Sequence, residues 1–109
     1  MTKYKVVIVV DGEETVDVVS AMSPADAIRK VSFDFLYDIE FYNPSDDDKE
    51  SMDDVELREM AAEVASDGVK LILRNLHNQT PSGCTYIQND EEETWPLPYN
   101  STITASFIE

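Results

Sequence analysis

The chain has 109 residues, 42% of them hydrophobic, and its 23 Asp and Glu against 8 Lys and Arg give a formal net charge of -15. This length and apolar content indicate a single small domain over residues 1–109 and exclude a fully disordered chain. The charge also argues against direct binding of nucleic acid, because that requires a positive surface.

The sequence contains no segment that predicts membrane association. Its longest purely aliphatic run, Val6–Val10, is too short to cross a bilayer, and the first residues lack the layout of a secretory signal. The single cysteine, Cys84, has no second cysteine with which to form an internal disulfide. We therefore expect a cytoplasmic protein, in the host cytoplasm if the source is viral.

The N-terminal part of the chain predicts a β-hairpin followed by a helix. Tyr4–Val10 and Thr15–Ala21 are rich in Val, and Asp11-Gly12 between them is typical of a tight turn. Ser23-Pro24 then supplies an N-cap and a proline at the first helical position. We expect the helix to end near Val31 or Ser32.

Phe33–Tyr42 fits two structures. Its aromatic and aliphatic residues alternate with polar ones, as in a strand, but some of them also continue the helical spacing. We favour a strand because of the alternation, and one longer helix remains the alternative because neither Gly nor Pro marks a junction.

A second helix is predicted after an acidic loop that contains Asp46–Glu50. Ser51 or Asp53 can cap this helix, and Gly68 stands where a left-handed residue would end it. Three further strands are expected, and they are Val69–Leu76, Cys84–Asn89 and Thr102–Ile108. The connections expected between the last three strands are His77–Gly83 and Asp90–Asn100.

This order of elements predicts an α+β fold, with a mainly antiparallel sheet of about five to six strands and two helices packed on one face. We expect the last strand to lie inside the sheet.

Acidic residues are concentrated between Asp38 and Asp67. On the second predicted helix, one set recurs every three or four residues and faces away from the apolar positions: Glu56, Glu59, Glu63 and Asp67. Such a row can offer carboxylates to the Lys and Arg of another protein. The competing interpretation is an ordinary solvated helix face next to an acidic loop.

Trp95 lies between Glu93 and Pro96 in the last loop, where it could anchor an interface or cover an edge of the core. From these patterns we predict the following partner-binding residues: Asp46, Asp47, Asp48, Glu50, Asp53, Asp54, Glu56, Glu59, Glu63 and Trp95.

We predict neither a metal site nor a catalytic site, and no cofactor. The acidic loop has neither the glycine nor the alternation of acids that an EF-hand requires. His77 and Cys84 could supply a base and a nucleophile, but no motif supports that geometry, and a surface histidine and a buried cysteine are the simpler interpretation. With three glycines in the chain, a phosphate-binding loop is also hard to build.

In size, charge, lack of a catalytic motif and rows of carboxylates, the chain resembles the small acidic proteins with which bacteriophages disable host defences. DNA-mimic anti-restriction and anti-CRISPR proteins are among them. The resemblance implies a stoichiometric inhibitor, monomeric or homodimeric, whose partner is a basic nucleic-acid-binding host protein.

Three other functions are compatible with the sequence. A phage protein could bind a host polymerase or assembly factor through shape and apolar contacts around Trp95–Tyr99, with the acidity serving steering and solubility. Adaptation to high salt and an enzyme dependent on His77 have less support in the residues.

Overall fold

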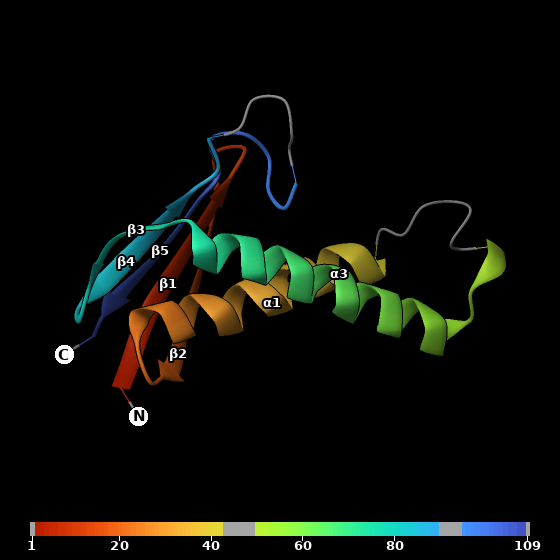
Figure 1. Cartoon of the computed structure of the whole chain (residues 1–109), viewed down its shortest axis with the longest axis horizontal. Helices are drawn as coiled ribbons and strands as arrows, with labels where there is room; N and C mark the ends of the chain where they lie inside the picture. The colour runs from red at the N-terminus through yellow and green to blue at the C-terminus, as the bar shows by residue number, and fades with distance from the viewer. Residues whose placement is uncertain (1, 43–49, 90–94, 109) are drawn as a thin grey trace.

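The computed structural model describes residues 2–42, 50–89 and 95–108, and they form an α+β fold as predicted. Five strands make one antiparallel sheet in the order β2-β1-β5-β4-β3, and two long helices lie side by side next to it (Figure 1). In chain order the elements are β1 (Thr2–Val10), β2 (Glu13–Ala21), α1 (Pro24–Tyr42), α3 (Asp54–Arg74), β3 (Leu76–Thr80), β4 (Gly83–Ile87) and β5 (Thr102–Phe107).

The predicted hairpin is confirmed. β1 and β2 pair from Val10↔Glu13 to Thr2↔Ala21, and Asp11 and Gly12 form the turn with φ of 52° and 81°. Two-residue turns that match the twist of a hairpin need positive φ at both positions, which Gly adopts freely and Asp tolerates. The Asp-Gly pair therefore fixes the register of the first two strands.

The position of the last strand inside the sheet is also confirmed. β5 pairs with β1 on one side and with β4 on the other. The C-terminal strand thus joins the N-terminal hairpin to the β3–β4 hairpin, and its pairing completes a single sheet.

The strand predicted for Phe33–Tyr42 is wrong, and the alternative of one longer helix is right. α1 begins at Pro24, where the Ser23 hydroxyl accepts a hydrogen bond from the Asp26 backbone N–H at 3.1 Å, and runs to Tyr42. Aromatic residues two apart in sequence also generate pairs four apart, and Phe33, Tyr37 and Phe41 stack along one side of the helix with centroids 6.1 and 6.0 Å apart. The alternation was therefore compatible with a helix.

The end predicted for the second helix and the strand predicted for Val69–Leu76 are also wrong. α3 continues through Gly68 to Arg74, and Asn75 is its C-cap. The helical spacing of small and apolar residues does not stop at Gly68, because the buried positions are Ala61, Ala65, Gly68, Val69 and Ile72. The aliphatic run after Gly68 belongs to this helix face.

The loop predicted for His77–Gly83 contains a strand. Leu76–Thr80 forms β3 at the edge of the sheet, where it pairs with β4 through an irregular register near Asn78, a residue with φ of 54°. Its side chains after Leu76 are exposed and polar, so no apolar alternation revealed it.

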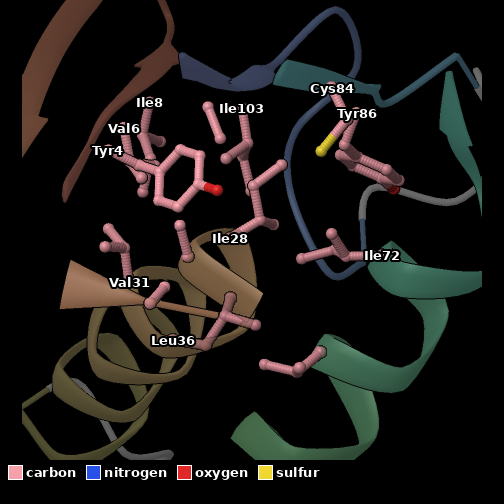
Figure 2. Close-up of a cluster of buried hydrophobic side chains, with 14 of the residues drawn as sticks. Tyr4, Val6, Ile8, Ile28, Val31, Leu36, Ile72, Cys84, Tyr86 and Ile103 are labelled. Carbon is pink, nitrogen blue, oxygen red and sulfur yellow. The ribbon is translucent and has the colours of Figure 1, made fainter. Parts of the chain in front are cut away.

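The core lies between one face of the sheet and the two helices. Figure 2 shows Tyr4, Val6 and Ile8 of β1 and Ile103 of β5 opposite Ile28, Val31 and Leu36 of α1, with Cys84 and Tyr86 of β4 near Ile72 of α3. The strand residues alternate in sequence because every second side chain of a strand points to the same face.

At Gly68, α3 lies in close contact with Leu36 of α1 and with Pro96. A Cβ atom at this position would lie 2.7 Å from Leu36 Cδ1 and 3.2 Å from Pro96 Cβ. Only a residue without a side chain fits the spacing without displacing Leu36 or Pro96. The predicted role of this glycine, to end the helix, is replaced by a role in packing.

We expect Gly68→Val to lower the free energy of unfolding by about 1–3 kcal/mol, because it forces extra methyl groups into a filled contact. Chemical denaturation monitored by circular dichroism measures this value. Lys70→Val, at an exposed position of the same helix, is the control for the helix propensity of Val and should cost below about 1 kcal/mol. Equal losses in the two variants would contradict the packing role of Gly68.

Candidate protein-binding surface

The acidic row predicted on the second helix is present on α3. We call Glu56, Glu59, Glu63 and Asp67 the acidic ridge. All four are exposed, and at about 100° per residue they lie opposite the face that buries Ala61, Ala65 and Ile72. Along the helix axis the ridge spans about 16 Å, with neighbouring carboxylates about 4.5 to 6 Å apart.

The other predicted acids are placed less uniformly. Asp53 is the N-cap of α3, and its carboxylate accepts a hydrogen bond from the Glu56 backbone N–H at 2.9 Å. Asp54 is exposed, but it lies roughly 160° around the helix from Glu56, so it is not part of the ridge. Glu50 is exposed and precedes α3. Asp46, Asp47 and Asp48 lie outside the described residues.

The ridge is on the part of the molecule that extends beyond the sheet. α3 runs back alongside α1, and the ends of both helices nearest the 42–54 connection lie far from the strands (Figure 1). The molecule is elongated, with extents of 47 × 32 × 23 Å. Arg58 does not neutralise the ridge, because its guanidinium lies over the Phe41 ring of α1, 5.5 Å from the centroid.

No residue of the acidic ridge forms an ion pair within the described part of the chain, where both ion pairs involve Asp26. The same row does contain cations farther along α3, since Lys70 and Arg74 follow Asp67 at spacings of three and four residues and are exposed. The spacing of these two bases is visible in the sequence, but no motif there marks them. Acids near the N-terminus of a helix and bases near its C-terminus suit the helix dipole.

The ridge has an energetic cost within the helix. Glu59–Glu63 and Glu63–Asp67 are like-charged pairs four residues apart, and Glu56–Glu59 is a pair three apart. Each such pair destabilises a helix by about 0.2–0.5 kcal/mol. Substitutions that remove this repulsion should therefore stabilise the fold.

Trp95 covers an edge of the core, which is one of the two roles that the sequence allowed, and its role as an interface anchor stays a prediction. One edge of its ring covers the buried side of α3, with Cζ2 3.6 Å from where a Cβ of Gly68 would be. The ring also borders a hollow of about 280 Å³ whose other walls include His77, Tyr86 and Gln88, and 41% of the residue remains exposed. Because Gly68 faces away from the acidic ridge, Trp95 and the ridge are separate surfaces.

His77 and Cys84 are not brought together. Cys84 pairs with Ala105 on the helix-covered face of the sheet, whereas His77 pairs with Thr85, whose side chain points to the opposite face. Burial raises the pKa of the Cys84 thiol, which lowers its thiolate fraction. Among the described residues, no three His, Cys, Asp or Glu side chains are grouped closely enough to hold a metal ion.

Neither of the described helices combines the length and the apolar character needed to span a membrane. Comparisons of the chain with protein families, with curated proteins and with solved structures give no match.

Asp26 is the described acid with the most internal partners. Its carboxylate accepts hydrogen bonds from the Met22 backbone N–H at 3.0 Å and from Arg29 Nε and Nη2 at 2.9 and 2.7 Å, and Lys30 Nζ lies 3.8 Å away. The Met22 hydrogen bond, followed by the Arg29 pair, lowers the pKa of Asp26 below its ordinary value of 3.8. These contacts join the end of β2 to the first turn of α1.

Because the pKa of Asp26 is lowered in the folded state, its ionised carboxylate stabilises the fold at pH values above the pKa of the unfolded chain. This contribution disappears as the pH falls through the pKa of the folded state. We expect Asp26→Ala to cost about 1 kcal/mol at pH 7. The difference from wild type should shrink as the pH falls below about 4, because the Asp26 carboxyl is protonated first in the unfolded chain and, at a lower pH, in the folded one. Thermal unfolding between pH 2 and pH 7 tests this, with Asp34→Ala as the reference for losing one negative charge from the same helix. A cost that stays constant with pH would contradict the assignment.

Proposed function

We propose that the chain is a stoichiometric protein inhibitor of the anti-restriction or anti-CRISPR type. It binds the basic nucleic-acid-binding surface of a host defence nuclease or effector by presenting carboxylates where that surface expects phosphates. It acts in the cytoplasm of the host without catalysing a reaction. The partner is a protein and not nucleic acid, since the chain itself carries a net charge of -15.

One observation carries this proposal. The acidic ridge is a row of four exposed carboxylates with no cation partner among the described residues, on a helix that extends away from the sheet. Such a row repels itself in the free protein. Charge-assisted hydrogen bonds to Arg and Lys of a partner would replace that repulsion by attraction.

The spacing of the ridge limits what it can imitate alone. Its carboxylates follow one another at about 4.5 to 6 Å, whereas one strand of DNA carries a charge about every 3.4 Å along the axis. The ridge is therefore sparser than a single strand. In this proposal, Asp46–Asp48 and Glu50, which precede α3 in the chain, supply further charges to the same partner.

A complex of this kind is sensitive to salt. Binding between opposite charges weakens as ions screen them, and the association rate falls as well. The dependence is weaker than for DNA, because carboxylates fixed on a folded protein release fewer condensed counterions.

The single substitution Glu63→Lys separates stability from binding. It converts two repulsive pairs, with Glu59 and Asp67, into attractive ones, so we expect the free energy of unfolding to rise by about 0.8–2 kcal/mol. Binding should weaken at least tenfold at low salt. Thermal unfolding and retention of the host partner on immobilised protein measure the two effects. A variant that is more stable and binds as well as wild type would contradict a role for the ridge.

Wild-type chain should capture the partner from host lysate, and competing duplex DNA should release it. Charge reversal of Glu56, Glu59 and Glu63 to Lys should abolish this capture. The matched control reverses Glu13 and Asp17 of β2 and Asp34 of α1, three exposed acids outside α3. Both triple variants change the net charge equally, so only a position-specific site distinguishes them. Equal loss in both variants would mean that total charge, and not the ridge, governs binding. The mimicry itself is then tested by measuring whether the purified chain inhibits DNA binding by the captured protein.

A second candidate function uses the Trp95–Tyr99 segment to bind a host polymerase or assembly factor. Its supporting observation is the exposure of two aromatic residues there, Trp95 at 41% and Tyr99 at 43%. If this function is right, Trp95→Ala should weaken capture by about tenfold or more, while the Glu56/Glu59/Glu63 reversal has a smaller effect. If the acidic ridge is the site, the order is reversed. Unfolding measurements on Trp95→Ala are needed alongside, since the ring also covers Gly68.

A further inference from the structure

The sheet has a second face that neither described helix covers. Tyr4, Val6 and Ile8 of β1 point to the helices, so the alternate residues of β1 and their cross-strand partners point the other way. We call this the open face. Its apolar centre consists of Val7, Val9, Val16, Val18 and Ile87.

Three of these five residues are exposed to solvent, and Val7 and Val9 are half-buried. The exposed fractions are 46% for Val16, 60% for Val18 and 40% for Ile87. Thr85, Thr102 and Thr104 extend the same surface across β4 and β5. A contiguous β-branched surface of this kind is typical of an interaction site.

The charge of the open face differs from that of the rest of the molecule. Of the 23 acids in the chain, Glu14 is the one on this face within the described strands, and it is accompanied by Lys3 and Lys5. A second copy of a chain with a net charge of -15 meets strong repulsion when it approaches most other surfaces. On the open face that repulsion is locally absent, and opposite charges are available.

We propose that the open face binds the open face of a second copy, so that two sheets pack face to face in a homodimer. The cross-strand pair Val7↔Val16 lies at the centre, with Lys5↔Val18 two residues away on one side and Val9↔Glu14 two residues away on the other. The twofold axis of this dimer lies between the two sheets, passes over the central pair and runs perpendicular to the strands. It places each Lys5↔Val18 pair over the Val9↔Glu14 pair of the second copy. Each Lys5 then lies over Val9 of the other copy and diagonally opposite its Glu14, which is about 4.8 Å to the side on the neighbouring strand, and this arrangement occurs twice per dimer.

The size of the face is compatible with a weak, specific dimer. Five strands about 4.8 Å apart and about six residues of about 3.3 Å each give roughly 480 Å² per copy. The total of about 1,000 Å² is at the lower end of specific interfaces, so association should depend on concentration. Growth by strand addition at the β2 edge is disfavoured, because Glu13, Glu14 and Asp17 there would meet like charges.

This inference does not rest on the proposed function. The helices lie on the outer sides of such a dimer, so each acidic ridge stays accessible. Salt separates the two interactions: screening should strengthen the association of two acidic copies and weaken binding to a basic partner.

Sedimentation velocity on the full chain, from about 5 to 500 µM, tests the proposal. We expect a shift from monomer to dimer over this range, which added salt moves to lower concentration. Val18→Asp should raise the dimer dissociation constant at least tenfold, whereas Val55→Asp, at a 64% exposed position of α3, should leave it within about threefold. Thermal unfolding of both variants verifies that each remains folded.

A charge swap tests the orientation of the two copies. Lys5→Glu and Glu14→Lys should each raise the dissociation constant about tenfold, because each change acts twice in the dimer, and the double swap should restore it to within about threefold. A wild-type chain that stays monomeric at 500 µM would overturn the proposal and point to another occupant of this face. An unchanged dimer in Val18→Asp, or no rescue by the double swap, would overturn it as well.

Discussion

The position of the acidic ridge depends on the close contact between α1 and α3 at Gly68. α3 packs mainly on α1, and α1 in turn packs on the sheet through Ile28 and Val31. The missing side chain at Gly68 lets Leu36 and Pro96 approach the α3 backbone. Because this contact fixes which side of α3 is buried, it also fixes which side carries the acidic ridge. Widening it would move the ridge relative to the sheet.

The charges are distributed unevenly over this frame. Acids occupy the outer side of α3, bases follow them toward its C-terminal end, and the open face of the sheet is nearly free of acids. Repulsion within the ridge destabilises the free protein, so the requirements of folding do not account for the arrangement. The helix dipole favours the same order of signs along α3, but its contribution is confined to the terminal turns. The dipole explains the positions of Asp54 and Arg74, which lie in the terminal turns of α3, more readily than the position of Glu63.

Two surfaces with opposite properties follow from the same topology. The hairpin and β5 form a sheet whose one face is filled by the helices, and the remaining face presents Val and Thr side chains to solvent. The acidic ridge lies on the far side of the helical layer. A dimer through the open face would therefore present two ridges outward, which would allow one dimer to engage two basic sites.

From the sequence alone, the N-terminal hairpin, the Ser23 cap, the α+β class and the acidic row could be predicted, because each depends on local spacing or on turn chemistry. The structure chose Asp53 over Ser51, the other candidate cap of the second helix. Tertiary structure decided the rest. Phe33–Tyr42 and Val69–Arg74 became helical because their apolar residues meet partners there, namely one another along α1 and the core beside Ile72. β3 exists because β4 supplies its hydrogen bonds, and its exposed polar side chains carry no local signal. Short patterns specify turns and caps, but the choice between helix and strand for an apolar segment depends on the surface against which it is buried.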